Sequence, residues 1–187
     1  QVTDLRRIYP TQTTSQGEIK DLLQMIFVNE LLKPSNEVWI VSPWISDIEI
    51  LDNRMGGFDG INPEWKGRKI LLTEISVQLM SIGSDIIFVM INADHEPHNR
   101  YFLDRVSSLA AESGLKDKLK CIEVPKPEKG TGLHIKGILT DKGYLSGSMN
   151  ITKSGLELNE EGVIYDINDQ RIIEGRNHFQ MTYLGDN

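Results

Sequence analysis

The stretch HIKGILTDKGYLSGSMN, residues 134–150, decides how this chain is interpreted. Side chains alternate between the two faces of a β-strand, so His134 and Lys136 lie on one face while apolar residues lie on the other. Residues 141–143, Asp-Lys-Gly, indicate a turn, because glycine accepts positive φ angles at low cost. The chain after this turn is therefore expected to return as a second strand towards the end of the hairpin that carries His134.

Several polar groups gather at that end of the predicted hairpin. The segment Gly147-Ser148-Met149-Asn150 supplies a hydroxyl and an amide. His134 adds a ring that titrates near neutral pH, and Lys136 adds an ammonium. The hairpin thus offers a nucleophile or base, a cation, a hydroxyl and an amide.

Length and composition are those of one ordinary globular domain. The chain has 187 residues, of which 39% are hydrophobic and 25% charged, so we expect a single domain over residues 1–187. Residues 1–15 are polar and rich in Thr and Gln, and they are expected to form a loose lead-in. The one cysteine, Cys121, excludes an internal disulfide framework and favours a reducing, cytoplasmic location.

Composition also narrows the function classes. The longest clean apolar run, residues 86–91, is far shorter than the ~20 residues of a membrane span. The first ten residues lack the apolar centre of a signal peptide. One cysteine does not make a zinc site, and no cofactor or metal is expected. The net charge of −7 argues mildly against sequence-independent binding of a polyanion, although a local basic groove is compatible with it.

The periodicity of the whole chain predicts an α/β fold. Helical spacing occurs in residues 18–32, 70–82, 99–113 and 169–183, with Asp169 as a possible cap of the last helix. Besides the hairpin, β-branched and aromatic runs predict strands at residues 37–42, 85–92, 118–125 and 162–167, and residues 52–67 are expected to be a loop. Helices between strands imply parallel neighbours. We therefore expect a mixed, mostly parallel β-sheet flanked by helices on both faces.

The hairpin resembles the signature of the phospholipase D superfamily, HxKxxxxD…GSxN. The matching residues are His134, Lys136, Asp141, Gly147, Ser148 and Asn150, with five residues between Asp141 and Gly147 where six are usual. Asn159 and Glu161 stand where short bacterial nucleases of this superfamily carry an Asn and a Glu. The resemblance implies a phospholipase D-like fold over most of the chain. It is strongest to small single-motif nucleases and to relatives found beside bacterial DNA-modification and restriction systems.

The resemblance assigns chemical roles to four of these residues. His134 is the expected nucleophile on phosphorus, and a phosphohistidine would divide one hard displacement into two easier ones. Glu161 is expected to accept a proton from the other ring nitrogen of His134, with Glu160 as the alternative partner. Lys136 and Asn150 are the remaining catalytic residues.

The resemblance also implies which residues of the motif bind phosphate and which shape the hairpin. Lys136, Ser148 and Asn150 are expected to bind the non-bridging phosphate oxygens and to stabilise charge in the transition state. Asp141 and Gly147 are interpreted as structural members of the motif.

One motif supplies half of the catalytic groups that this mechanism needs. A second histidine must protonate the leaving oxygen, and neither His95 nor His98 has the lysine partner that marks the motif. The resemblance implies a homodimer in which a two-fold axis brings His134 of two copies together. A metal site made by His95 and His98 is the less favoured alternative to two ordinary loop residues.

Three functions are compatible with these features. The favoured one is a metal-independent phosphodiesterase that cleaves nucleic acid, DNA foremost, in a bacterial restriction or antiviral defence system. A lipid-headgroup phosphodiesterase is disfavoured because no basic amphipathic helix is visible. The third is a dimeric subunit that is active only with a partner, such as an ATPase or a DNA-modification protein. Trp44 is an open candidate for lining the substrate groove, whereas Trp39 and Met149 are expected in the core.

Overall fold

A seven-stranded β-sheet forms the centre of the part of the chain that the structure describes. The structure is a computed structural model, and it describes residues 5–8, 15–126, 133, 135–157 and 162–185. The strand order is β1-β9-β8-β7-β2-β5-β6. The bounds are β1 Leu5–Ile8, β2 Glu37–Val41, β5 Asp85–Ile91, β6 Leu119–Val124, β7 Lys136–Leu139, β8 Tyr144–Gly147 and β9 Val163–Asp166.

The sheet is mixed, as the sequence predicts, but parallel pairing is limited to one edge. β2 and β6 both pair parallel with β5. The pairs β1–β9, β9–β8, β8–β7 and β7–β2 are all antiparallel. The expectation of a mostly parallel sheet therefore holds only for β2, β5 and β6. The hairpin β7–β8 reverses the chain without a crossover helix, and an antiparallel pair follows.

The N-terminal strand β1 is not predicted by the sequence pattern. It pairs with β9 from Leu5↔Asp166 to Ile8↔Val163. The expectation of a loose lead-in over residues 1–15 is therefore wrong for these four residues. Such a short edge strand is fixed by its partner more than by its own pattern, which is why sequence reasoning misses it.

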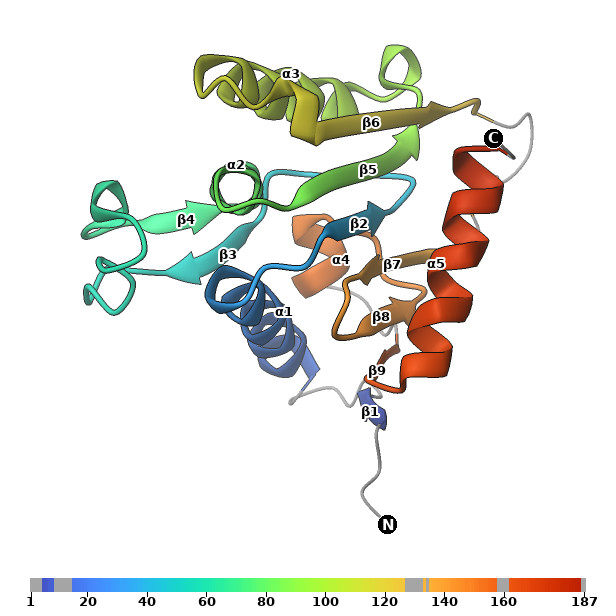
Figure 1. The fold of residues 1–187 in the computed structure, drawn as a ribbon, viewed down its shortest axis with the longest axis horizontal. Coiled ribbons are helices and arrows are strands. Elements are labelled where there is room, and N and C mark those ends of the chain that lie inside the picture. Colours follow the sequence, from blue (N-terminus) through green and yellow to red (C-terminus); the bar gives the residue numbers. More distant parts are fainter. Residues whose placement is uncertain (1–4, 9–14, 127–132, 134, 158–161, 186–187) are drawn as a thin grey trace.

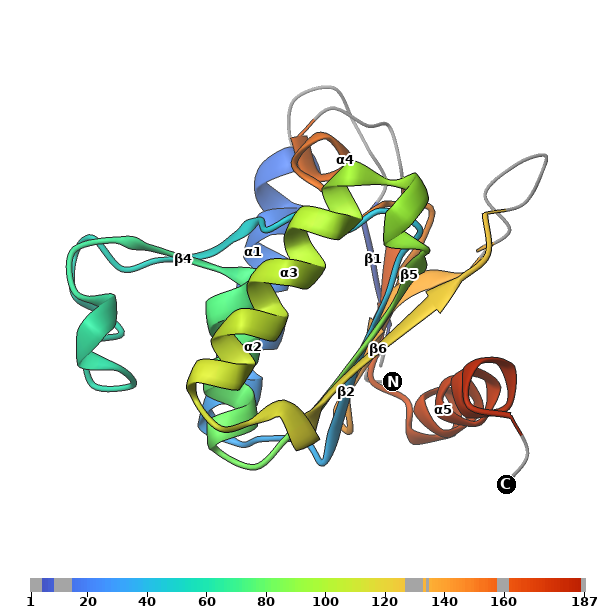
Figure 2. The same cartoon turned by 90° about the horizontal axis from the view of Figure 1, so that it is seen from above.

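Helices cover both faces of the sheet, as expected (Figures 1 and 2). Helices α1 (Ser15–Leu32), α2 (Leu72–Ser81) and α3 (Pro97–Glu112) lie on one face, where the short helix α4 (Lys153–Glu157) is also found. Helix α5 (Asp169–Tyr183) lies on the other face. Its N-cap is Asn168, whose side chain accepts hydrogen bonds from two backbone N–H groups of the first turn. Asp169 is thus inside the first turn and is not the cap.

The strands are apolar on both sides because both sides are covered. In β2, Val38 and Ile40 belong to the core beneath α1, α2 and α3, whereas Trp39 and Val41 belong to the core beneath α5. Trp39 is fully buried, as expected, and its ring lies 5.7 Å from that of Phe179 in α5. The alternation of side chains in adjacent strands thus divides the interior into two cores.

A two-stranded ribbon projects from the main body (Figure 2). It is formed by β3 (Glu49–Asp52) and β4 (Lys69–Leu71), with a 3-10 turn at Pro63–Trp65 in the intervening segment. The sequence predicts the loop between them but not the strands, and β4 occupies the first residues of the helix expected over 70–82.

No helix among the described residues combines the length and the apolar character that a membrane crossing requires.

Candidate phosphate-binding site

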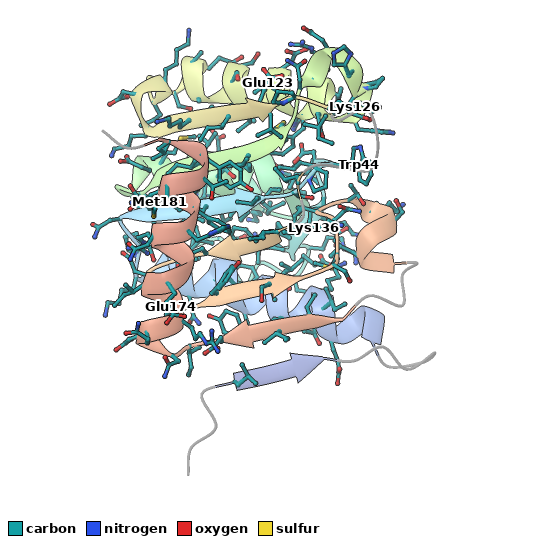
Figure 3. The ribbon with its side chains drawn as sticks, turned by 90° about the vertical axis from the view of Figure 1, so that its right-hand side faces the viewer. Trp44, Glu123, Lys126, Lys136, Glu174 and Met181 are labelled. Atoms are coloured by element: carbon teal, nitrogen blue, oxygen red, sulfur yellow. The ribbon has the colours of Figure 1, made fainter. Side chains whose placement is uncertain are left out.

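The candidate site lies at one end of the sheet. Lys136 begins β7 and Gly147 ends β8, and these two residues are opposite each other in the hairpin. β7 is antiparallel to β2, so the start of β7 lies at the carboxyl ends of β2, β5 and β6. In open α/β sheets, ligands bind outside the carboxyl ends of parallel strands. Figure 3 shows the side chain of Lys136 at this end, on the same side of the molecule as Trp44 and Lys126.

Lys136 presents a cation that no carboxylate among the described residues neutralises. Its Nζ donates a hydrogen bond to the carbonyl oxygen of Ser148 at 2.8 Å. Among the described residues, no carboxylate forms an ion pair with it. Lys136 precedes Ile138 by two positions, and Ile138 packs in the core beneath α1, α2 and α3. The ammonium therefore lies at the α1–α4 side of the sheet end, and within the described part of the chain it uses one of its three N–H donors.

Ser148 and Asn150 follow β8 and reach the same end. Ser148 is exposed, and its carbonyl accepts the bond from Lys136. The amide of Asn150 is partly covered, and its Oδ1 is buried without a hydrogen-bond partner among the described residues. An amide carries two N–H donors that suit phosphate oxygens. The structure thus brings Lys136, Ser148 and Asn150 to one end of the hairpin.

Gly147 is required by the close approach of β9. A Cβ atom at this position would collide with the carbonyl oxygen of Gly162, which precedes β9. The neighbouring loop is equally tight, since a Cβ at Gly155 would collide with the backbone of Asn150. These two contacts fix the path of the chain on both sides of Ser148 and Asn150.

Asp141 lies at the opposite end of the hairpin from Lys136. Its carboxylate accepts a hydrogen bond from the Asn36 backbone at 2.8 Å and forms an ion pair with Arg176 at 2.6 Å. Its own backbone N–H donates to Ser35 Oγ at 2.9 Å. Asp141 therefore ties the β7–β8 turn to the segment before β2 and to α5, and it does not face Lys136, Ser148 or Asn150.

Four residues named in the sequence analysis lie outside the described residues: His134, Asn159, Glu160 and Glu161. Leu133 and Ile135, which flank His134 in the sequence, contribute to the core beneath α5. His95 and His98 are exposed. The described residues contain no group of three or more His, Cys, Asp and Glu side chains arranged to hold a metal ion.

The loop after β2 is joined to the segment after Asn150. Ser46 N–H donates to the Ile151 carbonyl at 2.9 Å, and Ile151 N–H donates to Ser42 Oγ at 3.1 Å. Ser42 Oγ in turn donates to the carbonyl oxygen of Trp44 at 2.7 Å. Trp44 therefore belongs to the same loop cluster as Asn150, a proximity that sequence spacing does not reveal.

The indole of Trp44 takes part in a second interaction across the sheet end. Its side chain hydrogen-bonds to Glu96, and Glu96 forms an ion pair with Lys126 at 2.7 Å. The Lys126 ammonium lowers the pKa of the Glu96 carboxyl, and the bond from Trp44 adds to this lowering. Glu96 stays ionised at neutral pH and holds both partners in place. The sequence pattern around Glu96 and Lys126 does not indicate these contacts.

A cavity of about 540 Å³ lies between α1, the base of the β3–β4 ribbon and α4. Lys20, Lys69 and Lys153 line it, but Glu49 pairs with Lys20 at 2.9 Å and with Lys69 at 2.7 Å. Asp47 also lines the cavity, and burial raises its pKa although hydrogen bonds from Thr73 oppose the rise. Most charges here are matched within the fold.

Comparison with known proteins gives structural neighbours but no sequence relatives. No family model matches the chain, and no curated protein matches it. NucT from Helicobacter pylori is 13% identical over 94% of both chains, with a TM-score of 0.56. Nuc from Salmonella typhimurium, a phospholipase D family member, is 11% identical over 94% of this chain and 91% of its own, with a TM-score of 0.60.

A third neighbour is longer than this chain. Phosphatidylserine synthase from Haemophilus influenzae is 13% identical, covers 95% of this chain and is itself covered over 36% of its length, with a TM-score of 0.60. At such identities the likeness establishes the fold and leaves the activity to the site. The chain resembles the phospholipase D superfamily in its hairpin motif, and it has the fold of that superfamily.

Proposed function

We propose that this protein is a metal-independent phosphodiesterase that cleaves nucleic acid, with His134 as the nucleophile. The observation that carries the proposal is the ammonium of Lys136, which no described carboxylate neutralises and which lies at the sheet end with Ser148 and Asn150. A fixed cation flanked by hydrogen-bond donors suits a phosphate whose charge shifts during displacement. NucT and Nuc match this chain over more than nine-tenths of their lengths, which fits a small single-motif enzyme.

The proposed reaction proceeds in two displacements. One ring nitrogen of neutral His134 attacks phosphorus, the P–O bond to the leaving group breaks, and the leaving oxygen takes a proton from a second histidine. That histidine, now neutral, removes a proton from water, and the water oxygen displaces the imidazole from phosphorus. Glu161 holds the proton on the non-attacking nitrogen throughout. Lys136, Ser148 and Asn150 bind the non-bridging oxygens in both steps.

The second histidine is proposed to be His134 of a second copy. A two-fold axis through the site would place both rings on opposite sides of one phosphorus. The same axis would double Lys136 and Asn150 around the phosphate. The fold of one chain then supplies half a site, and the dimer is the catalytic unit.

Nucleic acid is the proposed substrate class, with DNA as the first choice. With a net charge of −7, few phosphates outside the site can be neutralised. Affinity for free DNA should therefore be weak and should fall steeply with salt. This fits a restriction or defence role in which an ATPase or a DNA-modification protein delivers the DNA.

A direct assay tests the proposal. The purified protein is incubated in EDTA, at low and moderate salt, with labelled single- and double-stranded DNA, RNA, and vesicles of phosphatidylcholine or cardiolipin. Nucleic-acid cleavage is expected at low salt, and His134→Ala should abolish it while the far-UV CD spectrum and the melting temperature stay nearly unchanged. Lipid turnover without nucleic-acid cleavage would overturn the substrate class, and full activity of His134→Ala would overturn the nucleophile.

A further inference from the structure

Three side chains form a row across the sheet end that carries Lys136. The strand order β7–β2–β5–β6 places Trp44, which follows β2, between Lys136 at the start of β7 and Lys126 just after β6. Figure 3 shows the same order, with Trp44 between the two lysines. Neighbouring strands are ~4.8 Å apart, so three strand steps span roughly 15 Å.

The row alternates between cation and aromatic ring. Proteins that bind unpaired nucleic acid combine cations that follow the phosphate backbone with aromatic side chains on which the bases stack. No carboxylate among the described residues pairs with Lys136, whereas Lys126 is paired with Glu96. The ring of Trp44 is therefore the distinctive feature of the row beyond the phosphate site itself.

Trp44 is partly exposed, and its backbone is held in place on both sides. Trp39 and Trp65 are 0% and 2% exposed, so Trp44 is the tryptophan that solvent and ligands can reach. The indole interacts with Glu96, and the ion pair with Lys126 at 2.7 Å holds the Glu96 carboxylate. The amide of Asn99 secures the backbone on both sides of Trp44, through bonds of 2.8 Å to Pro43 and 2.9 Å to Ile45. A ring held in this way loses little conformational freedom on binding.

We propose that Trp44 stacks on a nucleobase of a single-stranded nucleic acid whose phosphate is bound at Lys136. The inference rests on the proposed function and deepens it, because it selects unpaired strands as substrate. In a duplex, both faces of a base are already stacked on its neighbours, and a base must be flipped out before a protein ring can reach its face. Unpaired DNA or RNA offers that face without this cost.

The binding test separates base stacking from phosphate binding. His134→Ala serves as the background, so that ligands are bound and not cleaved. Two ligands are titrated at low salt: a short oligothymidine, and an abasic oligonucleotide of the same length that keeps the phosphates. Oligothymidine should quench tryptophan emission, and Trp44→Leu should remove the quenching and weaken oligothymidine binding about tenfold. The affinity of the variant that carries both His134→Ala and Trp44→Leu for the abasic strand should equal that of His134→Ala alone.

Matched variants and a melting curve control for disruption of the fold. Tyr101→Leu removes an exposed aromatic side chain from α3, 65% exposed, and should change neither affinity. Glu96→Gln loses the charge that pairs with Lys126 and should weaken oligothymidine binding less than Trp44→Leu does. Unchanged oligothymidine affinity in Trp44→Leu, or an equal loss for the abasic strand, overturns the inference.

The two proposals fail in different ways. If the wild-type protein cleaves single-stranded DNA and Trp44→Leu leaves oligothymidine affinity unchanged, stacking is wrong and the nuclease stands. If oligothymidine quenches Trp44 but the wild-type protein cleaves no nucleic acid, the binding site is supported and the nuclease is wrong.

Discussion

Lys136 Nζ donates a hydrogen bond to the carbonyl oxygen of Ser148 at 2.8 Å, joining the first residue of β7 to the residue that follows β8. The bond is exposed, so it contributes little to stability. Its effect is to hold the ammonium beside the loop that carries Asn150. The proposal that Lys136 serves catalysis more than folding follows from this placement.

Lys136→Met should lower the turnover rate by about 10²–10³, the loss typical of one charge-stabilising group. The free energy of unfolding in urea should change by less than about 1 kcal/mol, because the lost bond is exposed. Lys118→Met serves as a control, since Lys118 also bonds to a carbonyl oxygen, that of Gly83, although it pairs with Asp85 at 3.0 Å as well. Equal losses of turnover in the two variants would contradict a role for Lys136 in the site.

Activity should survive excess EDTA. Lys136 and Asn150, doubled by a two-fold axis, would supply the charge and hydrogen bonds that metal ions supply in two-metal nucleases. Turnover is measured after dialysis against chelator and again after addition of Mg²⁺ or Mn²⁺. Loss of activity in chelator with recovery on addition of either ion would show that the site needs a metal.

The protein should be a dimer at micromolar concentration, measured by sedimentation. Mixing His134→Ala with the wild-type chain offers a second measurement, because a site at the two-fold axis needs both copies. Heterodimers should be inactive, and activity should fall in proportion to their fraction. A monomer with full activity would place the second catalytic histidine elsewhere in the same chain.

Asp141→Ala should destabilise the fold and spare the chemistry. The change removes the ion pair with Arg176 and the acceptor for the Asn36 backbone, both at the hairpin end remote from Lys136. We expect a loss of roughly 1–3 kcal/mol in the free energy of unfolding. A double-mutant cycle with Arg176→Ala isolates the interaction free energy between Asp141 and Arg176. Loss of turnover in a fully folded variant would indicate a catalytic role for Asp141.

Arg105→Gln should destabilise the protein more at neutral pH than at about pH 4. Burial raises the pKa of Asp47 above its ordinary value, and the Arg105 charge, 2.8 Å away, opposes that rise. The folded state therefore holds the proton of Asp47 to higher pH than the unfolded state does, and stability falls as pH rises between the two pKa values. Without Arg105 the folded pKa rises further, which enlarges that fall.

Arg105→Gln is expected to lower the free energy of unfolding by roughly 1 kcal/mol at neutral pH, a value between those typical of surface and of buried ion pairs. Urea unfolding at both pH values provides the measurement. Equal destabilisation at the two would mean that Arg105 acts through packing instead of charge.

Features set by short stretches of sequence are predicted well. The run at residues 85–91 forms β5, and the turn at 141–143 brings Lys136 opposite Gly147. Both outcomes depend on side-chain alternation and on one local reversal of the chain. The buried Trp39 and Met149 follow from the same patterns.

Features set by strand order are not predicted. The pairing of β1 with β9 and the row from Lys136 through Trp44 to Lys126 join residues that are remote in sequence. Nothing in the local pattern of Glu96 indicates that it binds both Trp44 and Lys126. Such contacts depend on which strands become neighbours, and the hydrophobic periodicity of each strand carries little of that information.

The gap between Lys136 and Asp141 in the motif corresponds to the length of β7 and the start of its turn. The motif therefore joins two separate roles, a proposed phosphate-binding lysine at one end of a strand and a structural tether at the other. In a homologue that lost the activity but kept the fold, the lysine could be substituted. The aspartate would still be needed, because it joins the β7–β8 turn to the rest of the fold. A distant homologue that keeps the aspartate but lacks the lysine would then share the ancestry and not the activity. A motif search that requires every position would miss such a homologue.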